Sequence, residues 1–582
     1  MFRFSPRNNR AHLVKWREWG EAAFQEAHDK DKLVAVCITA FWCGFCQRMD
    51  ETTLSNDDVI TLLNALFVPV RVDEAQRPDV DIRYNQDGWP TIAFLTPEGD
   101  HLVSVNYMDT EPFLDLLVRL INYYQQEKPA LQEQFAQARA AATRNGDGAA
   151  PAPPSAETVA RITGLVEGLA DQEHGGYGIG AKFLHPEANE FLLSLFETTG
   201  ERAFLDHVLL TLTRMRASRT YDAGDGGFFR YSSRRDWQEP HQEKLLEDQA
   251  ALLCNYLHAY LLTDEPSYRE TAQGLIQYLN TTLYDATKGV FFGCQDYLRP
   301  DGFSFRSSSG PPELMSLIDT NIYCDANAHV ASAYLDAWWL LGLDDCRAQA
   351  RSVLAWLWKN LRVPDGGMCH YSDGEPRVRG ILTDSVMTGL ALLDASVLLH
   401  DGTYLGQALE LAEYIVRRHR NPHGGFFDIS ETGPARLHYP LTRLTQNAGA
   451  VTFFDRLATL TGEARYREEA HWALRSFTNT GDQYDVQAAS FGHALAQLLA
   501  HPITLTINGT AGDPAVRALA RAARTQLGQQ NLMVSFHESR WDGESRSDRP
   551  ATIAINSPSG RVGPITDPAA LRPELLTPFR QQ

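Results

Sequence analysis

The sequence predicts a multidomain protein in which an α/β domain is followed by an all-α barrel of six helix hairpins and a small α/β segment. Three observations support this class. Apolar runs alternate with short amphipathic stretches over residues 11–126. Residues 136–156 are rich in alanine, glycine and proline and lack apolar periodicity, as a linker does. From residue 157, long amphipathic helices alternate with recurring turns, which indicates an internal repeat.

These changes of composition set the predicted boundaries. Residues 1–135 form the first domain, 136–156 the linker, 157–502 the barrel and 503–582 the C-terminal segment. In that last segment we expect strands over 503–507, 532–537 and 552–555, a helix over 513–527 and a final helix over 567–575. It carries no motif that indicates a chemistry of its own.

The overall composition excludes several classes of function. The chain has 582 residues, of which 43% are hydrophobic and 22% charged, and its formal net charge is −20. The negative charge argues against a nucleic-acid or anionic-membrane surface. No 18-residue apolar run and no apolar signal core is present, so neither a membrane span nor secretion is expected. Eight scattered cysteines favour reduced thiols and a cytoplasmic location, and nothing points to a metal or another cofactor.

The first domain shows the order β-α-β-α-β-β-α after a short leading helix. The expected strands are 33–40, 67–73, 91–96 and 102–106, and the expected helices are 47–54, 59–66, 78–88 and 111–126. A turn at Pro97–Asp100 joins the last two strands. This order places the end of the first strand directly before a helix.

Two cysteines, Cys43 and Cys46, lie at that junction. A helix N-terminus favours the thiolate of the first cysteine, because the helix dipole and free N–H groups stabilise negative charge there. Such a thiolate can attack a disulfide, and the second cysteine can then resolve the mixed disulfide. Half of a zinc site is a weaker alternative, since no second pair follows in this domain. A fold that keeps the pair without redox work is the other alternative.

A proline in Gly88-Trp89-Pro90 opens a later strand, where its missing N–H is tolerated. With the cysteine pair, this proline makes residues 11–125 similar to the thioredoxin superfamily. The resemblance implies that Pro90 is preceded by a cis peptide bond and lies against the cysteines.

Two kinds of turn recur after residue 157. The first combines glycine with an aromatic or apolar residue, at 175–178, 226–229, 289–292, 366–369 and 424–427, with a weaker copy at 481–484. The second alternates with it, at 199–201, 263–265, 342–344, 400–402 and 461–463. The pattern predicts helix hairpins with different turns at their two ends. Six hairpins can close into a ring, and an open solenoid is the alternative.

By analogy with known barrels, we expect a pocket at the end that carries the glycine-aromatic turns. Asp248, Asp384 and Asn447 precede later tyrosines by nearly equal intervals, which places them at equivalent helix starts facing one axis. Asp248, Asp384 and His241 are the candidate acid–base groups. The candidate substrate-binding residues are Lys182, His185, Tyr231, Trp237, Glu243, Lys244, Asp325, His329, His370, Arg443 and Asn447. A ring of such groups suits a hydroxyl-rich, sugar-like ligand. The alternative for each aspartate is a helix cap.

The order of motifs along the chain resembles one family, the YyaL-type thioredoxin-domain proteins, also described as spermatogenesis-associated protein 20-like. The resemblance rests on residues 16–20, 43–46, 71–80, 88–90, 240–250 and 564–568. It implies a thioredoxin-like domain followed by a six-hairpin barrel similar to glycosidases and N-acylglucosamine 2-epimerases. It implies no particular reaction. The pair here encloses Gly44 and Phe45, where the family often has His or Trp.

Three functions therefore compete. The first is a redox protein in which Cys43 and Cys46 exchange disulfides with a protein partner and the barrel holds a partner or ligand. The second is a carbohydrate-active isomerase or hydrolase with a regulatory redox domain. The third is a non-catalytic binding protein in which both sites are surfaces only.

Overall fold

A computed structural model describes residues 2–86, 88–142, 154–298, 315–477, 485–500, 502–527, 532–538, 550–557 and 560–579. The chain divides into two compact units. Unit 1 comprises residues 1–150, 297–315 and 429–441, and unit 2 comprises 151–296, 316–428 and 442–582. The sixth glycine-containing turn expected at 481–484 lies outside the described residues.

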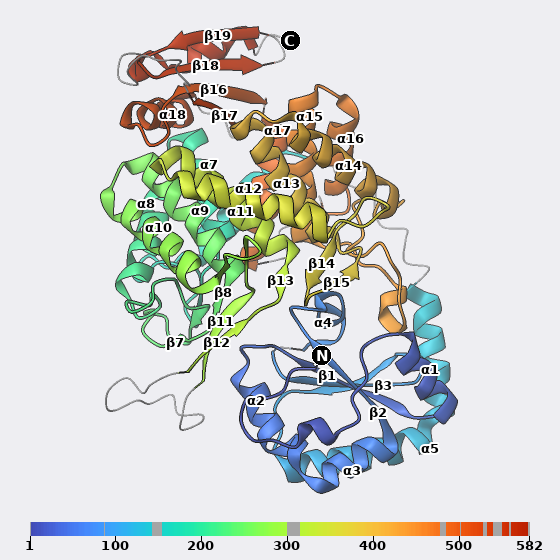
Figure 1. Cartoon of the computed structure of the whole chain (residues 1–582). Coiled ribbons are helices and arrows are strands. Elements are labelled where there is room, and N and C mark those ends of the chain that lie inside the picture. Colours follow the sequence, from blue (N-terminus) through green and yellow to red (C-terminus); the bar gives the residue numbers. More distant parts are fainter. Residues whose placement is uncertain are drawn as a thin grey trace. The chain divides into compact units, whose positions relative to one another are not determined.

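Unit 1 is built on a four-stranded sheet of order β2-β1-β3-β4. Strand β1 pairs in parallel with β2 and antiparallel with β3, and β3 pairs antiparallel with β4. The strands are β1 Leu33–Thr39, β2 Phe67–Asp73, β3 Thr91–Leu95 and β4 His101–Val105. The helices are α1 Glu21–Lys30, α2 Gly44–Glu51, α3 Asp57–Leu66, α4 Pro78–Tyr84 and α5 Thr110–Ala142 (Figure 1). This confirms the α/β order expected from the sequence.

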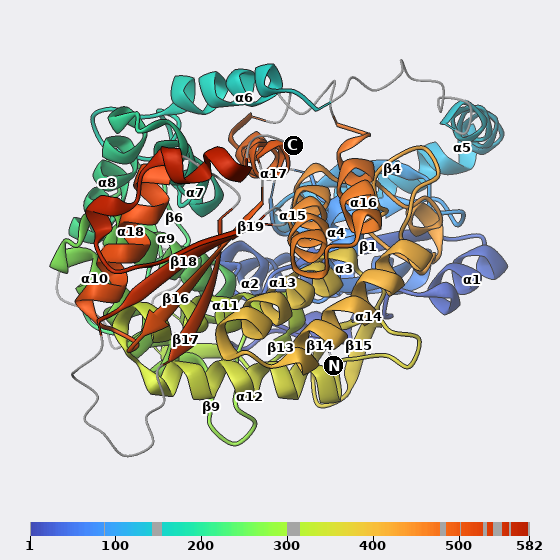
Figure 2. The same cartoon turned by 90° about the horizontal axis from the view of Figure 1, so that it is seen from above.

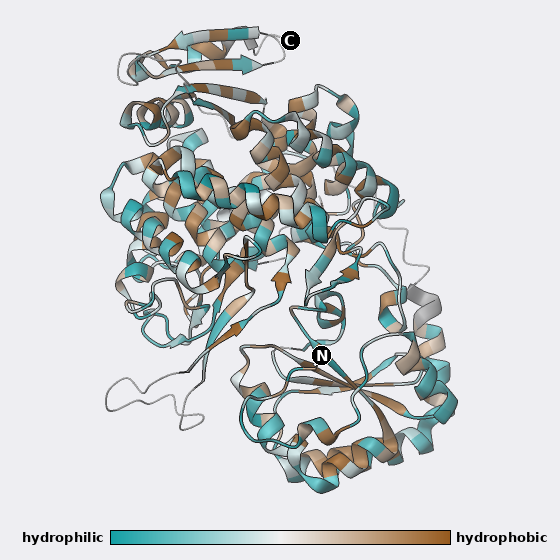
Figure 3. Cartoon of the chain, in the orientation of Figure 1, coloured by the Kyte–Doolittle hydropathy of each residue, from teal (hydrophilic) through white to brown (hydrophobic). Residues whose placement is uncertain are grey.

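Every residue of β1 is buried, which explains its continuous apolar sequence. Alternate side chains of β1 belong to two different apolar clusters. Leu33 and Ala35 pack in one cluster, and Val34 and Val36 pack in the other. In Figure 3 the strands of this sheet are largely brown, in agreement with a core on both of its faces. The carboxyl end of β1 is thereby fixed, and α2 begins five residues later at Gly44.

Unit 1 also contains a segment that is remote in sequence, Ile429–Leu441. Ile429 and Leu437 are 4% and 3% exposed and belong to the same apolar cluster as Val34 and Tyr84. The Arg436 N–H donates to the Tyr84 hydroxyl over 3.0 Å, and the Arg436 Nη1 donates to the Arg83 carbonyl, also over 3.0 Å. The core of unit 1 is therefore completed by residues that lie between two barrel helices in the chain.

Unit 2 is a ring of six helix hairpins. Its inner helices are α7 Pro186–Thr199, α9 Leu246–Thr263, α11 Cys324–Leu341, α13 Leu382–Leu399, α15 Leu444–Thr461 and α17 Ala488–Leu499. Each inner helix contacts the next, and α17 contacts α7, so the ring closes (Figure 2). The outer helices are α6 Ala156–Leu169, α8 Arg202–Ala217, α10 Pro266–Tyr278, α12 Asp344–Asn360, α14 Gly402–Arg418 and α16 Ala464–Leu474. The six-hairpin prediction is confirmed, and closure excludes the open solenoid.

The glycine-aromatic turns are held by a repeated amide clamp. Gln249, Asn327 and Asn447 each occupy the fourth position of an inner helix. The Gln249 Oε1 accepts from the Phe228 N–H over 2.7 Å, and the Asn447 Oδ1 accepts from the Phe426 N–H over 2.7 Å. Their amide nitrogens donate back to the same two residues' carbonyls. The preceding residue Gly425 has φ +74°, a conformation that favours glycine.

The C-terminal segment forms a second four-stranded sheet, of order β17-β16-β18-β19. Its elements are β16 Ile503–Gly509, α18 Pro514–Leu527, β17 Leu532–Glu538, β18 Thr552–Ser557 and β19 Gly560–Ile565. Strand β16 pairs in parallel with β17 and antiparallel with β18. Helix α18 contacts α7 and α9, and β17 contacts α13, so the segment packs on the ring.

Within the described residues, α13 is one helix long and apolar enough to cross a membrane. It is an inner helix of the ring, and 67% of its 18 residues are buried there. Its apolar composition is therefore accounted for by packing inside the barrel.

Candidate functional sites

The cysteine pair lies at the start of α2, shortly after the carboxyl end of β1. Cys43 is the N-cap of α2, and the two cysteines form a disulfide with their Cα atoms 5.2 Å apart. The Cys46 N–H donates to the Cys43 Sγ over 3.0 Å. A backbone donor and a helix N-terminus both stabilise negative charge on that sulfur once the disulfide is reduced. The geometry therefore favours Cys43 as the nucleophile.

Aromatic residues surround the pair. Trp42 and Trp89 pack edge to face with their ring centres 5.2 Å apart, and both contact the small cluster that contains Cys43 and Cys46. The Trp89–Pro90 peptide bond is cis. Cys43 is 6% exposed and Phe45 beside it is 39% exposed. The nearly buried sulfur of Cys43 therefore lies beside an exposed aromatic ring.

Polar contacts of Trp89 and of Arg71 hold the surroundings of the pair in place. Trp89 Nε1 donates to the Asp81 Oδ1 over 2.9 Å, which orients the indole against the cysteines. Burial raises the pKa of Asp81, and the hydrogen bonds from Asn85 and Trp89 oppose that rise.

A second polar contact joins α2 to the sheet. Asp50 of α2 accepts two hydrogen bonds, of 2.9 and 2.8 Å, from Arg71 of β2. Burial raises the pKa of Asp50, and Arg71 limits the rise.

At the barrel end with the glycine-aromatic turns, three predicted residues come together. His370 Nδ1 lies 2.9 Å from Asp384 Oδ1, and both side chains are buried. Ligand atoms of Asp325, His370 and Asp384 lie within 4.8 Å of one another, so within the described residues these three could hold a metal ion. Burial raises the pKa of Asp384 to about 6 against the opposing effect of His370. The mouth thus holds a buried, hydrogen-bonded carboxyl–imidazole pair, in which burial favours the protonated form of the carboxyl.

Two further carboxylates stand beside this group. Burial, with Asp325, raises the pKa of Glu247. Burial, with Glu247, raises the pKa of Asp248 well above its usual range. The Asp248 Oδ2 is buried and has no hydrogen-bond partner in the described part of the chain. These two acids therefore resist losing their protons, so the neutral carboxyl form is favoured at the mouth.

His329 lies one helical turn beyond Asp325 on α11, with its Nε2 3.9 Å from the Cys254 Sγ. Burial lowers the pKa of His329, so the imidazole tends to be neutral.

Two other predicted binding residues, Glu243 and Arg443, lie near the starts of inner helices. Glu243 is 4% exposed, and its Oε1 lies 3.4 Å from the Arg230 Nη1. Arg443 immediately precedes α15.

His241 is held in an aromatic stack. It lies 4.1 Å from the Tyr231 ring centre, and Tyr231 lies 4.8 Å from that of Phe183. Paired short strands place the three side by side, because Phe183 pairs with Tyr231 and Tyr231 with His241. His185 contacts the edge of this stack, 6.2 Å from Phe183 between ring centres.

Four of the residues proposed to bind substrate hold the barrel loops. The fully buried Lys182 Nζ lies 2.7 Å from Asp171, and the fully buried Lys244 Nζ lies 2.6 Å from Asp222. Trp237 is 1% exposed and donates from Nε1 to the His174 carbonyl. Asn447 is the amide clamp described above. The structure brings none of these into the group around Asp384.

Asn447 differs from the two aspartates by an offset of one residue in its helix. Asp248 and Asp384 are the third residues of α9 and α13, whereas Asn447 is the fourth residue of α15. One residue turns a helix by about 100°, so its side chain meets the loop instead of the barrel axis.

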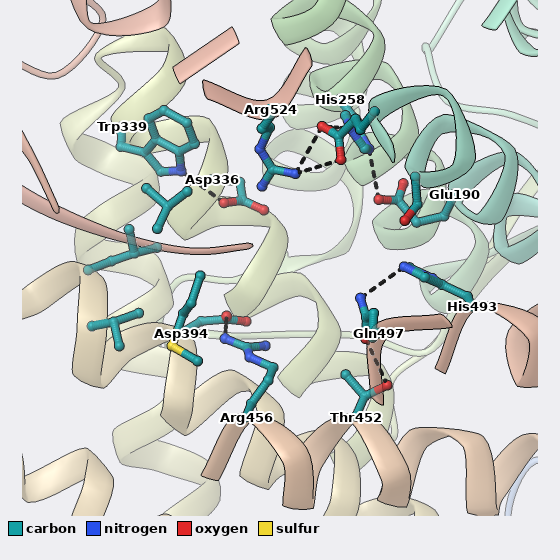
Figure 4. Close-up of a pocket in the computed structure, with 16 residues that line it drawn as sticks. Glu190, His258, Asp336, Trp339, Asp394, Thr452, Arg456, His493, Gln497 and Arg524 are labelled. Atoms are coloured by element: carbon teal, nitrogen blue, oxygen red, sulfur yellow. Dashed lines mark hydrogen bonds and ion pairs between the residues drawn. The ribbon is translucent and has the colours of Figure 1, made fainter. Parts of the chain in front are cut away.

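A cavity of about 200 Å³ lies farther along the same inner helices (Figure 4). Its polar lining comprises Glu190, Ser194, Glu197, His258, Asp336, Asp394, Thr452, Arg456, His493, Gln497 and Arg524. Trp339, Val397, Leu398, Met533 and Val534 complete the wall. Arg524 comes from α18, and Met533 and Val534 come from β17, so the C-terminal segment closes this end.

Sequence reasoning missed this cavity although a signal was present. His258, Asp336, Asp394 and Arg456 each lie twelve residues after the first residue of an inner helix. A charge or imidazole at one repeat position of four consecutive apolar helices indicates a shared polar centre. Asp336 is eleven residues beyond Asp325 on α11, about 16 Å at 1.5 Å per residue, so the cavity and the mouth are separate.

Two ion networks line the cavity. His258 Nδ1 lies 2.8 Å from Glu190 and its Nε2 lies 3.0 Å from Glu197, while Arg524 lies 3.1 Å from Glu197. Burial lowers the pKa of His258, but the two glutamates outweigh burial and raise it to about 10. Arg456 pairs with Asp394 on the other side. These networks keep most of the lining charges neutralised.

Fold and sites together define a thioredoxin-like α/β unit with a disulfide-bonded cysteine pair, joined in one chain to a six-hairpin α/α barrel. Residues 6–143 match the family model Thioredox_DsbH, described as a protein of unknown function, DUF255. The chain is 32% identical over 321 residues to spermatogenesis-associated protein 20 of Homo sapiens, covering 51% of this chain and 40% of that protein. The Rattus norvegicus protein is 31% identical over 306 residues, covering 49% of this chain and 38% of that protein.

The resemblance expected from the sequence is thus confirmed, and the chain spans about 40% of the length of the curated relatives it matches. Among solved structures, a D-mannose isomerase matches 60% of this chain and 99% of its own at 11% identity and a TM-score of 0.47. A sugar epimerase from a ruminal bacterium matches 54% of this chain and 83% of its own at 14% identity and a TM-score of 0.45.

Proposed function

We propose that the protein is a thiol–disulfide oxidoreductase that acts through Cys43 and Cys46. One observation carries this proposal: the disulfide-bonded pair lies at the start of α2, with the Cys46 N–H directed at the Cys43 sulfur. The rings of Trp42 and Trp89 against the pair and the exposed ring of Phe45 support it, because they provide an apolar surface beside the sulfur.

Thiol–disulfide exchange at this pair needs no cofactor beyond the two cysteines. In the reduced protein, the Cys43 thiolate attacks one sulfur of a partner disulfide, forms a mixed disulfide and releases the first partner thiolate, which takes up a proton. The Cys46 thiolate then attacks the Cys43 sulfur and releases the second partner thiol. Two electrons pass to the partner, and the Cys43–Cys46 disulfide re-forms. An external dithiol returns the pair to its reduced state.

A trapping experiment tests this proposal. Cys46→Ser removes the resolving thiol while Cys43 remains able to attack, so incubation with a disulfide-containing protein is expected to give a covalent adduct through Cys43. The adduct is detected on a non-reducing gel and disappears with dithiothreitol. Cys43→Ser in parallel is expected to give no adduct. Equal trapping by both variants, or by neither, contradicts the proposal.

The His370–Asp384 pair favours a second function, acid–base chemistry on a sugar-like ligand at the barrel mouth. Asp384 faces Asp325 and is bonded to an imidazole, an arrangement that suits proton transfer to and from a hydroxyl or a carbon next to a carbonyl. The aromatic stack of Tyr231 and His241 offers polarisable ring edges. This proposal does not require redox chemistry at Cys43.

Asp384→Asn tests it by aldose–ketose conversion of D-glucose, D-mannose and cellobiose. If Asp384 is the base, activity rises as pH passes about 6, where the carboxylate forms, and the variant loses about 10²–10⁴-fold in kcat with no remaining step at that pH. Asp206→Asn, an exposed site on α8, is the control and is expected to behave as the unmodified protein. Conversion that is unaltered in Asp384→Asn contradicts the proposal.

A further inference from the structure

The cavity closed by the C-terminal segment has one carboxylate more than its cations can pair. Glu190 and Glu197 share His258 and Arg524, and Asp394 pairs with Arg456. In the described part of the chain, no cation forms an ion pair with Asp336, whose Oδ1 accepts a 2.9 Å hydrogen bond from the Trp339 Nε1. Burial, with Asp394, raises the pKa of Asp336 to about 6, as expected for two carboxylates without enough compensation.

The remaining polar groups suit hydroxyls. Ser194, Thr452 and Gln497 can each donate and accept hydrogen bonds, and all three line the cavity. Figure 4 shows Thr452 beside Gln497. The Thr452 Oγ1 is 3.4 Å from the Gln497 Oε1, a long contact that a ligand hydroxyl can improve. An apolar wall of Val397, Leu398 and Met533 faces the carbon skeleton of such a molecule.

Size limits the ligand. A cavity of about 200 Å³ corresponds to roughly six or seven waters at about 30 Å³ each, which is below the usual range for drug-sized ligands. One small molecule can occupy this volume favourably if its own groups make the hydrogen bonds that water would make there. A molecule with several hydroxyls and one positive charge can hydrogen-bond to the polar lining and can also pair with the Asp336 carboxylate.

We propose that this cavity is a binding site for a small polyhydroxylated amine, with its ammonium group beside Asp336 and Asp394 and its hydroxyls bonded to Ser194, Thr452 and Gln497. The site is composite, because Arg524, Met533 and Val534 of the C-terminal segment close it. It lies about 16 Å along α11 from the barrel mouth and needs neither the cysteine pair nor acid–base chemistry at Asp384.

Calorimetric titration of the full-length chain at pH 7 tests the proposal with three open-chain probes of matched size. D-Glucamine carries a positive charge, D-glucitol none and D-gluconate a negative charge. D-Glucamine is expected to bind at least tenfold more tightly than D-glucitol, because a hydrogen bond to an ionised group contributes more than a neutral one. D-Gluconate is expected to bind most weakly. Equal affinity for D-glucamine and D-gluconate, or no heat from any probe at millimolar concentration, overturns the proposal.

Variants locate the binding. Asp336→Asn keeps the size of the side chain and its acceptor for Trp339, and is expected to weaken D-glucamine binding at least tenfold while leaving D-glucitol binding nearly unchanged. Asp345→Asn makes the same change on the exposed first turn of α12 and is expected to alter neither affinity. D-Glucamine affinity that is unchanged in Asp336→Asn overturns the proposal.

A second change keeps the test decisive if Asp336→Asn fails to fold. Thr452→Val nearly conserves volume and removes one hydroxyl from the wall, so both D-glucamine and D-glucitol are expected to bind severalfold more weakly. Cys43→Ser is expected to bind all probes as the unmodified chain does, so failure of this site is distinguishable from failure of the redox proposal. Full affinity of Thr452→Val for both probes contradicts the placement.

Discussion

Replacing Cys43 by serine is expected to reduce disulfide reductase activity to the uncatalysed rate. Cys43 is the sulfur that receives the Cys46 N–H and the field of the α2 N-terminus, and a serine hydroxyl is not ionised near neutral pH. Reduction of insulin disulfides by dithiothreitol, followed by turbidity, measures the effect.

The matched control for this experiment is Cys37→Ala. Cys37 is a free, buried thiol on β1, and burial raises its pKa to about 12, so it is not a nucleophile at neutral pH. Its replacement is expected to leave the catalysed rate unchanged. A Cys43→Ser variant with full activity would refute the redox proposal, whatever the behaviour of the barrel.

Arg71→Leu is expected to lower the free energy of unfolding of unit 1 by about 3–5 kcal/mol, because it leaves a buried carboxylate without its counter-ion. Arg71 and Asp50 side chains are 5% and 1% exposed, and two hydrogen bonds join them. Asp50 also accepts from the Ser5 N–H over 2.9 Å, and Arg71 lies over the Phe4 ring. Denaturant unfolding followed by tryptophan fluorescence measures the loss.

Two further variants separate the charge effect from general damage. Arg119→Leu breaks an exposed pair with Asp115 and is expected to change stability by less than about 1 kcal/mol. Asp50→Leu combined with Arg71→Leu removes both charges and is expected to be less destabilised than Arg71→Leu alone. A loss below about 1 kcal/mol in Arg71→Leu would mean that Asp50 is solvated on its own.

The sequence was sufficient for the parts of the fold that depend on periodicity and local turn chemistry. The buried run Leu33–Thr39 and the repeated glycine-aromatic turns specified the two architectures, because burial on both faces and closely packed loops leave a direct mark on composition. Ring closure followed from the number of repeats.

Residue roles were harder to predict because they depend on which way a side chain turns. Lys182 and Lys244 are residue types that often bind ligands, but each forms an ion pair with an aspartate of the barrel loops, Asp171 and Asp222. His370 and Asp384 belong to different elements, a short strand and an inner helix, and only the fold brings them to 2.9 Å. The cavity depends on Arg524, which lies more than three hundred residues from its partner Glu197.

The segment Ile429–Leu441 has a consequence for how the protein is made. Two apolar side chains of the N-terminal unit's interior, Ile429 and Leu437, are encoded far downstream of its sheet. During synthesis, the apolar cluster on one face of the sheet therefore lacks these two side chains until most of the barrel has left the ribosome. A fragment that ends at residue 150 lacks these side chains permanently, so its redox behaviour would be that of an incomplete domain.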